Sequence, residues 1–373
     1  GPVRARLAQA PIASPDGRRV AFSALGDIRV QALGGVGPGR AIAAGYQPSW
    51  SPDGQTLLFV TWSERDGGAV WRAPADGSAS PAKVSDIPAY YSYPMFTPDG
   101  AEVLAVRSPA AARQRSSFES GRRRSAELVA FPVHGGPARV VFRGLLGGRP
   151  HFSRDPGAVY LVAGEGLIRI DVATGAHSLV AQVKGPGYYF VEGDVPVDDL
   201  RLSPDGRQLL ALVAEQLYVL PLPKPGATVD VTDSASGARR LTDVGADYFE
   251  WRPDGEVDLS VGAQFSRVSL SAPGVAQQRP RLTARLTAEA PRARPRGTLL
   301  LRGGRALTMA QGDRIVEHAD ILVVDDRIAA IGPRGSFAVP PGAAIRDISG
   351  KTVLPGFIDE HDHIGSVRRE VLS

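Results

Sequence analysis

Two histidines near the end of the chain, His361 and His363, have the residue type and the spacing of metal ligands. They follow the apolar run 353–358, whose residue types favour a strand. Because side chains alternate between the two faces of a strand, both histidines would share a face with Phe357 and Asp359. Imidazoles about 7 Å apart along a strand can converge on one metal ion at about 2.0–2.1 Å. The same pair is also compatible with an edge strand whose histidines face water.

The run 355–363 reads Pro-Gly-Phe-Ile-Asp-Glu-His-Asp-His. It resembles the Pro-Gly-Phe-Ile-Asp-x-His-x-His signature that opens the barrel of the amidohydrolase superfamily, the metal-dependent hydrolases. The resemblance implies that His361 and His363 bind a divalent metal, Zn, at the C-terminal mouth of a (β/α)8 barrel, with one or two ions in the intact enzyme. It also implies that Asp359 supports these histidines through a hydrogen bond, although a purely structural role for Asp359 is equally open.

What this resemblance implies about activity is hydrolysis of an amide, a related C–N bond or an ester in a small-molecule or peptide-like substrate, by a metal-activated water. A barrel takes about 250 residues, and ten residues follow His363. We therefore expect 356–373 to hold only the first strand of a truncated barrel. The missing metal ligands would come from the remaining barrel portion of the same protein, which could be a separate chain. Alone, this chain is expected to be inactive.

Strand signals precede this run. Apolar stretches lie at 298–301, 306–309, 319–324, 327–333 and 344–350. The pair Asp325-Asp326 joins two of them as a hairpin turn, and we expect a positive φ at Asp326, a conformation that aspartate tolerates. Residues 298–355 resemble the small β-sandwich of amidohydrolases.

A repeat of about fifty residues organises the rest of the chain. Ser-Pro-Asp-Gly or a close variant begins at residues 14, 51, 97, 153, 203 and 252, with spacings of 37, 46, 56, 50 and 49. Proline at the second position and glycine at the fourth suit a tight turn. A short strand precedes each turn and a β-rich run follows it, so each unit reads as a small antiparallel sheet. Six such units in series predict a β-propeller.

This pattern resembles the TolB-like propeller, with the turn joining the inner strands of each blade. We thus predict a mainly β protein: a six-bladed TolB-like propeller at 1–278, an Arg/Pro-rich linker at 279–297, the small sandwich at 298–355 and the barrel strand at 356–373. Tyr46, Tyr93 and Tyr248 precede three of the turns, where they could line the central channel or pack between blades.

Composition limits the remaining classes. The 373 residues are 43% hydrophobic and 22% charged with a net charge of +4, which is typical of a folded protein of more than one domain. The arginines cluster in loop-like stretches without interleaved aromatics, which argues against nucleic-acid binding. No apolar run reaches the roughly 18 residues of a membrane span, and the absence of cysteine excludes disulfides.

Two functions are compatible with this organisation. The first is the N-terminal part of a metal-dependent amidohydrolase, with the propeller as an accessory or substrate-screening domain. The second is a non-catalytic, TolB-like propeller that acts as a scaffold for protein binding, with an inactive hydrolase stub. By family analogy we expect a bacterial protein that is periplasmic or secreted.

Overall fold

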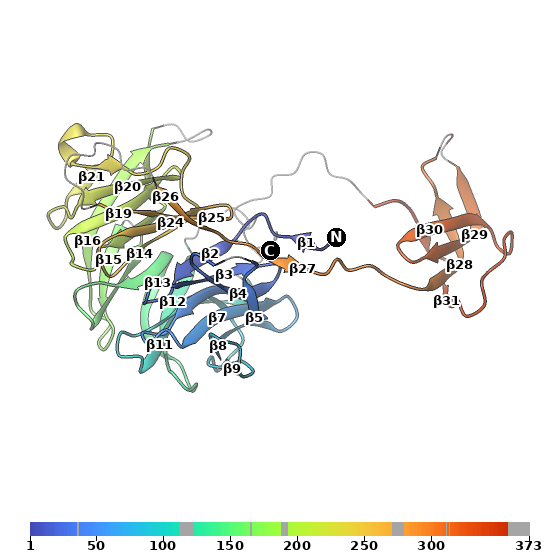
Figure 1. The fold of residues 1–373 in the computed structure, drawn as a ribbon, viewed down its shortest axis with the longest axis horizontal. Coiled ribbons are helices and arrows are strands. Elements are labelled where there is room, and N and C mark those ends of the chain that lie inside the picture. The colour runs from blue at the N-terminus through green and yellow to red at the C-terminus, as the bar shows by residue number, and fades with distance from the viewer. Residues whose placement is uncertain are drawn as a thin grey trace. The chain divides into compact units, whose positions relative to one another are not determined.

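The computed structural model describes residues 1–35, 37–111, 123–164, 166–187, 193–270, 280–310, 312 and 314–356. These residues form two compact units. One unit consists of Arg4–Ala290 and is a β-propeller; the other consists of Gly1–Val3 with 291–356 and is a small β-sheet (Figure 1). The predicted mainly β fold is thus confirmed, since nearly all of the described regular structure is strand.

Four blades of the propeller are separate four-stranded antiparallel sheets, and their strands follow one another in the chain except in blade 5, where β21 intervenes and pairs with β16. Blade 1 contains β2 (Gln9–Ala13), β3 (Arg19–Ala24), β4 (Asp27–Ala32) and β5 (Arg40–Ala44), and blade 2 contains β6 (Tyr46–Trp50), β7 (Thr56–Ser63), β8 (Gly67–Pro74) and β9 (Ala82–Lys83). Blade 5 contains β18 (Asp199–Leu202), β19 (Gln208–Val213), β20 (Gln216–Pro221) and β22 (Arg239–Arg240), and blade 6 contains β23 (Tyr248–Trp251), β24 (Val257–Val261), β25 (Gln264–Val268) and β26 (Arg281–Arg285).

Blades 3 and 4 form one continuous sheet because they share strand β13 (Arg139–Phe152). The first half of β13 pairs with β12 as the outer strand of blade 3, and its second half pairs with β14 as the inner strand of blade 4. The other strands of this sheet are β10 (Tyr90–Phe96), β11 (Glu102–Ser108), β12 (Arg123–Pro132), β14 (Ala158–Ala163), β15 (Gly166–Asp171), β16 (His177–Pro186), β17 (Asp194–Pro196) and β21 (Thr228–Asp230). The described residues therefore form six blades, the number predicted from the six turn motifs.

The repeated turn connects the first and second strands of each blade. In four blades its first hydroxyl donates to the aspartate two residues later, at 2.5–2.6 Å, and the glycine has a φ between +68° and +73°. This hydroxyl is the largest influence that lowers the pKa of each of these aspartates: Asp16, Asp53, Asp99 and Asp205. The turn therefore needs both the short polar side chains and the glycine.

Hydrogen bonds from blade 1 and the segment before it to the end of β26 and the segment after it close the ring. The Gln31 side chain donates to the Arg285 carbonyl at 2.9 Å and accepts from the Thr287 N–H at 3.0 Å. The Ala5 N–H donates to the Ala288 carbonyl at 3.0 Å. A two-stranded sheet of β1 (Val3–Arg4) and β27 (Glu289–Ala290) lies at this closure, and a short 3-10 helix, η1 (Ser234–Ser236), precedes β22.

Each joint between neighbouring blades has its own hydrophobic cluster. Ile28 of blade 1 packs with Trp50 and Phe59 of blade 2, for example, and Val162 of blade 4 packs with Leu200 of blade 5. Each large side chain buried in this way contributes roughly 1.5–3 kcal/mol to folding. Because these clusters lie between blades rather than within them, each blade depends on its two neighbours.

The small unit is a five-stranded sheet in the order β30 (Arg327–Pro333), β29 (Ile315–Val324), β28 (Thr298–Leu307) and β31 (Ala344–Asp347), with β32 (Thr352–Val353) also paired to β28. The stretches predicted as separate strands at 298–301 and 306–309 are one strand, because β28 passes through a bulge at Gly303 and Gly304. A Cβ on Gly304 would lie 2.6 Å from Ile348 Cδ1, so only glycine fits there.

Two sequence expectations differ from the structure in detail. The positive φ of the β29–β30 hairpin falls on Asp325, not on Asp326, and the Asp325 carboxylate accepts from the Gly297 N–H at 2.9 Å. The stretch predicted as a linker from residue 279 begins with β26, the outer strand of blade 6, and the propeller unit extends to Ala290. Side chains alternate along this arginine-rich stretch, and Ala284 of β26 pairs with Phe265 of β25.

Candidate functional site

The predicted metal ligands follow the last described strand. β32 pairs in parallel with β28, through Thr352 with Arg305 and Val353 with Ala306, and the described chain continues to Gly356. Asp359, His361 and His363 lie outside the described residues, so their convergence on a metal stays a prediction. Within the part of the chain that the structure describes, no group of three or more His, Cys, Asp or Glu side chains could hold a metal ion.

The three predicted channel tyrosines do not occupy equivalent positions. Counted back from the first residue of the turn, Tyr93 and Tyr248 hold the fourth position, whereas blade 2 has Gln47 there and Tyr46 one residue earlier. All three tyrosines are half-buried, and Tyr46 packs against the hydrophobic cluster between blades 2 and 3. The Gln47 side chain instead accepts a hydrogen bond from the Tyr93 N–H at 2.8 Å, which links blades 2 and 3.

The fourth position before the turn carries a different residue in each blade. In chain order these residues are Ala10, Gln47, Tyr93, Arg149, Asp199 and Tyr248. Positive φ values at Ala10, Gln47 and Tyr93 mark a bulge in the first strand of blades 1 to 3. At this position the residues of blades 1 to 3 are uncharged. The charged residues are Arg149 of blade 4 and Asp199 of blade 5.

A charged cluster joins blades 4, 5 and 6 around this position. It consists of Arg149, Asp199, Arg201 and Glu250. An Arg149 guanidinium nitrogen lies 3.4 Å from a Glu250 carboxylate oxygen, and an Arg201 nitrogen lies 2.7 Å from Asp199 Oδ2. Arg201 also donates to the Arg149 carbonyl, and its Nε, which is buried, has no acceptor among the described residues. The cluster therefore connects three blades through charge-assisted hydrogen bonds.

Burial decides the protonation of this cluster. It raises the pKa of Asp199 to about 6, although Arg201 and backbone N–H donors act in the opposite direction. It also lowers the pKa of Arg149, against the attraction of Glu250. Two guanidinium groups balance two carboxylates when Asp199 is ionised, and one positive charge is in excess when Asp199 is protonated. These four side chains can hold charge and brace the blades, and they include no nucleophile.

His151 belongs to the same joint. Its Nε2 accepts a hydrogen bond from the Leu202 N–H at 2.8 Å, and its ring stacks on Tyr160 with centroids 5.9 Å apart. Burial and the nearby Arg201 hold the pKa of His151 well below its usual value, so the imidazole is neutral. Sequence reasoning missed this histidine and the charged cluster, although comparison of the six repeats at the second and fourth positions before each turn would have found both.

Comparison with curated proteins finds enzymes of the amidohydrolase type over a short part of the chain. The dihydroorotase of Mycobacterium tuberculosis is 40% identical over 73 residues, which is 20% of this chain and 15% of that enzyme. The adenine deaminase of Brucella abortus is 40% identical over 68 residues, 18% of this chain and 10% of that enzyme. The chain thus spans less than a sixth of the length of these relatives. No family model matches it.

Comparison with solved structures finds proteins of low sequence identity. TolB from Acinetobacter baumannii is 13% identical with a TM-score of 0.44, over 77% of this chain and 67% of that one. Oligogalacturonate lyase from Vibrio parahaemolyticus is also 13% identical with a TM-score of 0.44, over 67% of this chain and 73% of that one. Among the described residues, no helix has the length and apolar character to cross a membrane.

Proposed function

We propose that this chain belongs to a metal-dependent hydrolase that acts on C–N bonds, with the propeller as an accessory domain. The observation that carries the proposal is the 40% identity to a dihydroorotase and to an adenine deaminase, in a chain that also contains the motif His361-Asp362-His363. Imidazole nitrogens are suitable donors for zinc, and two of them account for half of a tetrahedral site. The other ligands would come from the barrel portion.

In this proposal His361 and His363 hold a divalent metal, and Asp359 fixes the orientation of an imidazole through a hydrogen bond. The chemistry that such a metal supplies when bound is a water of lowered pKa and a polarised carbonyl. A neutral imidazole is the form that binds metal, so occupancy would fall as the pH drops below the pKa of the histidines. The same proposal places the protein in the periplasm or among secreted proteins.

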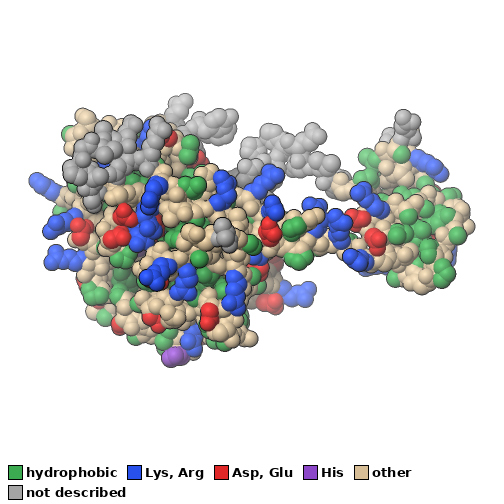
Figure 2. Space-filling view, in the orientation of Figure 1, with side chains coloured by type: hydrophobic (Ala, Val, Ile, Leu, Met, Phe, Trp, Pro, Cys, Tyr) green, Lys and Arg blue, Asp and Glu red, His purple; other side chains and the backbone are tan. Residues whose placement is uncertain are grey.

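Exposed apolar side chains on the small sheet support a larger assembly. Ile328 and Ile345 are 64% and 56% exposed, and they belong to β30 and β31, the two outer strands of the sheet order. Hydrophobic side chains cover much of the visible surface of this unit (Figure 2). Apolar surface of this kind is expected where further polypeptide packs. We propose that the barrel portion of the hydrolase covers it.

The test uses the protein at its full natural length. The intact mass of the purified polypeptide, measured under denaturing conditions, is compared first with the mass expected for that length. Metal content is then measured for the wild type, His361→Asn, His363→Asn and, as a control, His318→Asn, an exposed histidine of the same small unit. We expect each motif variant to lose most of the metal and to lose at least about 100-fold in hydrolysis of cyclic amides and aminopurines. The control should keep both properties.

Equal metal content in all four proteins would overturn the assignment of the ligands. A protein that binds no metal and hydrolyses none of these substrates would favour the scaffold function instead. Pull-down experiments with the propeller unit would then be the next measurement.

A further inference from the structure

The joint between blades 4 and 5 contains an open space, whereas side chains occupy the same place in the joint between blades 1 and 2. Between blades 1 and 2, the Arg19 guanidinium lies 4.8 Å from the centre of the Trp50 ring and donates to the Gly54 carbonyl at 2.7 Å. Arg19 begins the second strand of its blade, and Trp50 ends the first strand of the next blade. These two side chains together occupy the groove on the turn side of the joint.

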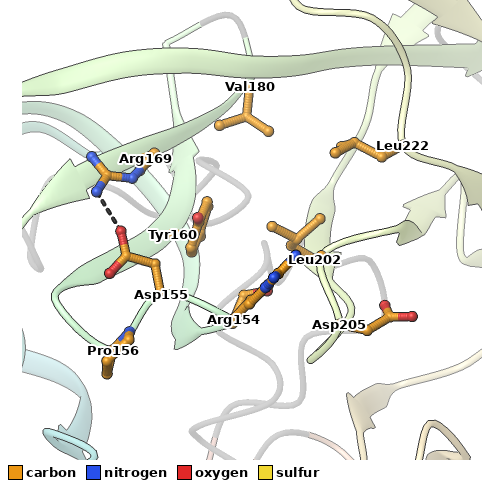
Figure 3. A pocket seen from close by; sticks show the side chains of 11 residues that line it. Arg154, Asp155, Pro156, Tyr160, Arg169, Val180, Leu202, Asp205 and Leu222 are labelled. Atoms are coloured by element: carbon orange, nitrogen blue, oxygen red, sulfur yellow. Dashed lines mark hydrogen bonds and ion pairs between the residues drawn. The ribbon is translucent and has the colours of Figure 1, made fainter.

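Between blades 4 and 5 the same two positions carry the smaller side chains of Ala158 and Leu202. Ala158 begins the second strand of blade 4 and Leu202 ends the first strand of blade 5. The pairing register confirms the equivalence, since Phe152 pairs with Val159 as Ala13 pairs with Val20. A cavity of about 560 Å³ lies at this joint and is lined by both turns (Figure 3). Leu202 thus lines an open space at the position where Trp50 contacts Arg19 in the first joint.

The turn of blade 4 departs from the motif in a way that adds charge to this cavity. Arg154 occupies the position that is proline in the other five turns. The hydroxyl of Ser153 donates across the joint to the Ser203 carbonyl at 2.6 Å. Asp155 forms an ion pair with Arg169, drawn as a dashed line in Figure 3. Arg154 is exposed and forms no ion pair with the described residues.

Asp205 supplies the opposite charge from the turn of blade 5. Its Oδ1 accepts from the Ser203 hydroxyl at 2.6 Å and from the Arg207 N–H at 3.1 Å. These hydrogen bonds keep the pKa of Asp205 low, so the carboxylate is ionised at neutral pH. Asp205 and Arg154 both line the cavity and form no ion pair with each other in the described part of the chain, so each can bind a charge on a ligand.

The remaining wall is apolar. Val180 and Leu222 lie on one side of the space in Figure 3, and Leu202 lies opposite them with Arg154 and Asp205. A site with an exposed guanidinium, an exposed carboxylate and an apolar wall matches a zwitterion with apolar substituents. We propose that this cavity binds a short apolar peptide with free termini, its carboxylate on Arg154 and its ammonium on Asp205. The volume is within the range of small-molecule pockets, and the inference does not depend on the proposed metal site.

The test is calorimetric titration of the chain with the dipeptide Leu-Phe and with two modified forms, N-acetyl-Leu-Phe and Leu-Phe amide. We expect each modification to weaken binding at least about tenfold, because each removes one charge-assisted contact. Asp205→Asn should weaken binding of Leu-Phe and leave binding of N-acetyl-Leu-Phe unchanged. Arg154→Gln should weaken binding of Leu-Phe and leave that of Leu-Phe amide unchanged. This pattern assigns each terminus to its side chain.

Matched controls come from blade 1. Asp16→Asn removes the equivalent turn carboxylate and Arg18→Gln removes an exposed arginine of the same turn, so both should leave binding unchanged. Leu202→Trp should fill the cavity and abolish binding. The proposal is overturned if Leu-Phe does not bind, if the modified peptides bind as tightly as Leu-Phe, or if the blade 1 variants weaken binding as much as the variants of blades 4 and 5.

Discussion

The joint between blades 1 and 2 and the joint between blades 4 and 5 are built from the same repeat and differ in the side chains beside the turns. Arg19 and Trp50 contact each other in the first joint, whereas Leu202 lines a cavity of about 560 Å³ in the second. The pairing of the first two strands corresponds in both places, since Phe152 pairs with Val159 as Ala13 pairs with Val20. The comparison shows that the repeat specifies the position of a joint, and the side chains beside the turns determine how the joint is packed.

The largest expected effect is the loss of the side chain that fills the first joint. Trp50 is buried, and its indole N–H donates to the Ile12 carbonyl at 3.0 Å. Trp50→Ala should lower the free energy of unfolding by about 3–5 kcal/mol. Leu202→Ala should cost only about 2 kcal/mol, because Leu202 already borders a cavity. Urea denaturation of both variants measures the difference, and equal losses would contradict the contrast between the joints.

The charged cluster of blades 4 to 6 provides a second contrast, which is tested by measuring the free energy of unfolding as a function of pH. In the folded chain the pKa of Asp199 is about 6, above the ordinary value of 3.8. The folded state therefore binds this proton more tightly than the unfolded state, so Asp199 makes stability rise as the pH falls from about 7 to about 4. Asp199→Asn should remove this contribution, up to about 3 kcal/mol over that range.

The control for this prediction is Gln47→Asn, since Gln47 is the uncharged residue at the equivalent position of blade 2. Urea denaturation at several pH values between 4 and 7 gives the stability of each variant. A wild-type protein and an Asp199→Asn variant with parallel pH profiles would show that Asp199 titrates at an ordinary pKa.

The smallest expected effect concerns Arg19. Arg19→Ala removes a charge-assisted hydrogen bond to the Gly54 carbonyl and a cation–π contact with Trp50. We expect a loss of about 1–2 kcal/mol. The neighbouring Arg18, which is exposed, should change stability by less than about 0.5 kcal/mol when replaced by alanine. If both arginines proved equally dispensable, Arg19 would not be a packing element of the first joint.

The sequence was sufficient to predict the blades, since each Ser-Pro-Asp-Gly turn requires a specific local geometry and lies between two apolar runs. It was also sufficient for the hairpin at Asp325-Asp326. It was less informative where tertiary pairing overrides composition. The arginine-rich stretch after residue 279 reads as a linker by composition, and its alternation at 282–286 fits a strand of either domain. Only tertiary pairing decides the choice: Arg281–Arg285 pairs with β25 as the outer strand of blade 6.

The charged cluster escaped prediction for a different reason. Arg149, Asp199 and Glu250 are far apart in the sequence, and none of them belongs to the turn motif. Only closure of the ring brings blade 6 close enough to blade 4 for Glu250 to reach Arg149. A repeat locates equivalent positions, but it does not show which of those positions interact across blades.

The sharing of strand β13 by two blades affects how this propeller folds and unfolds. Leu146 pairs with Arg123 in blade 3 and with Ala163 in blade 4, so one uninterrupted backbone segment serves two blades. Blades 3 and 4 should consequently exchange their amide hydrogens as a single cooperative unit. A backbone cut at Gly45, between β5 and β6, would separate two intact sheets, whereas a cut at Leu146 would divide one sheet into two incomplete ones. New chain termini are therefore better tolerated at Gly45 than at Leu146.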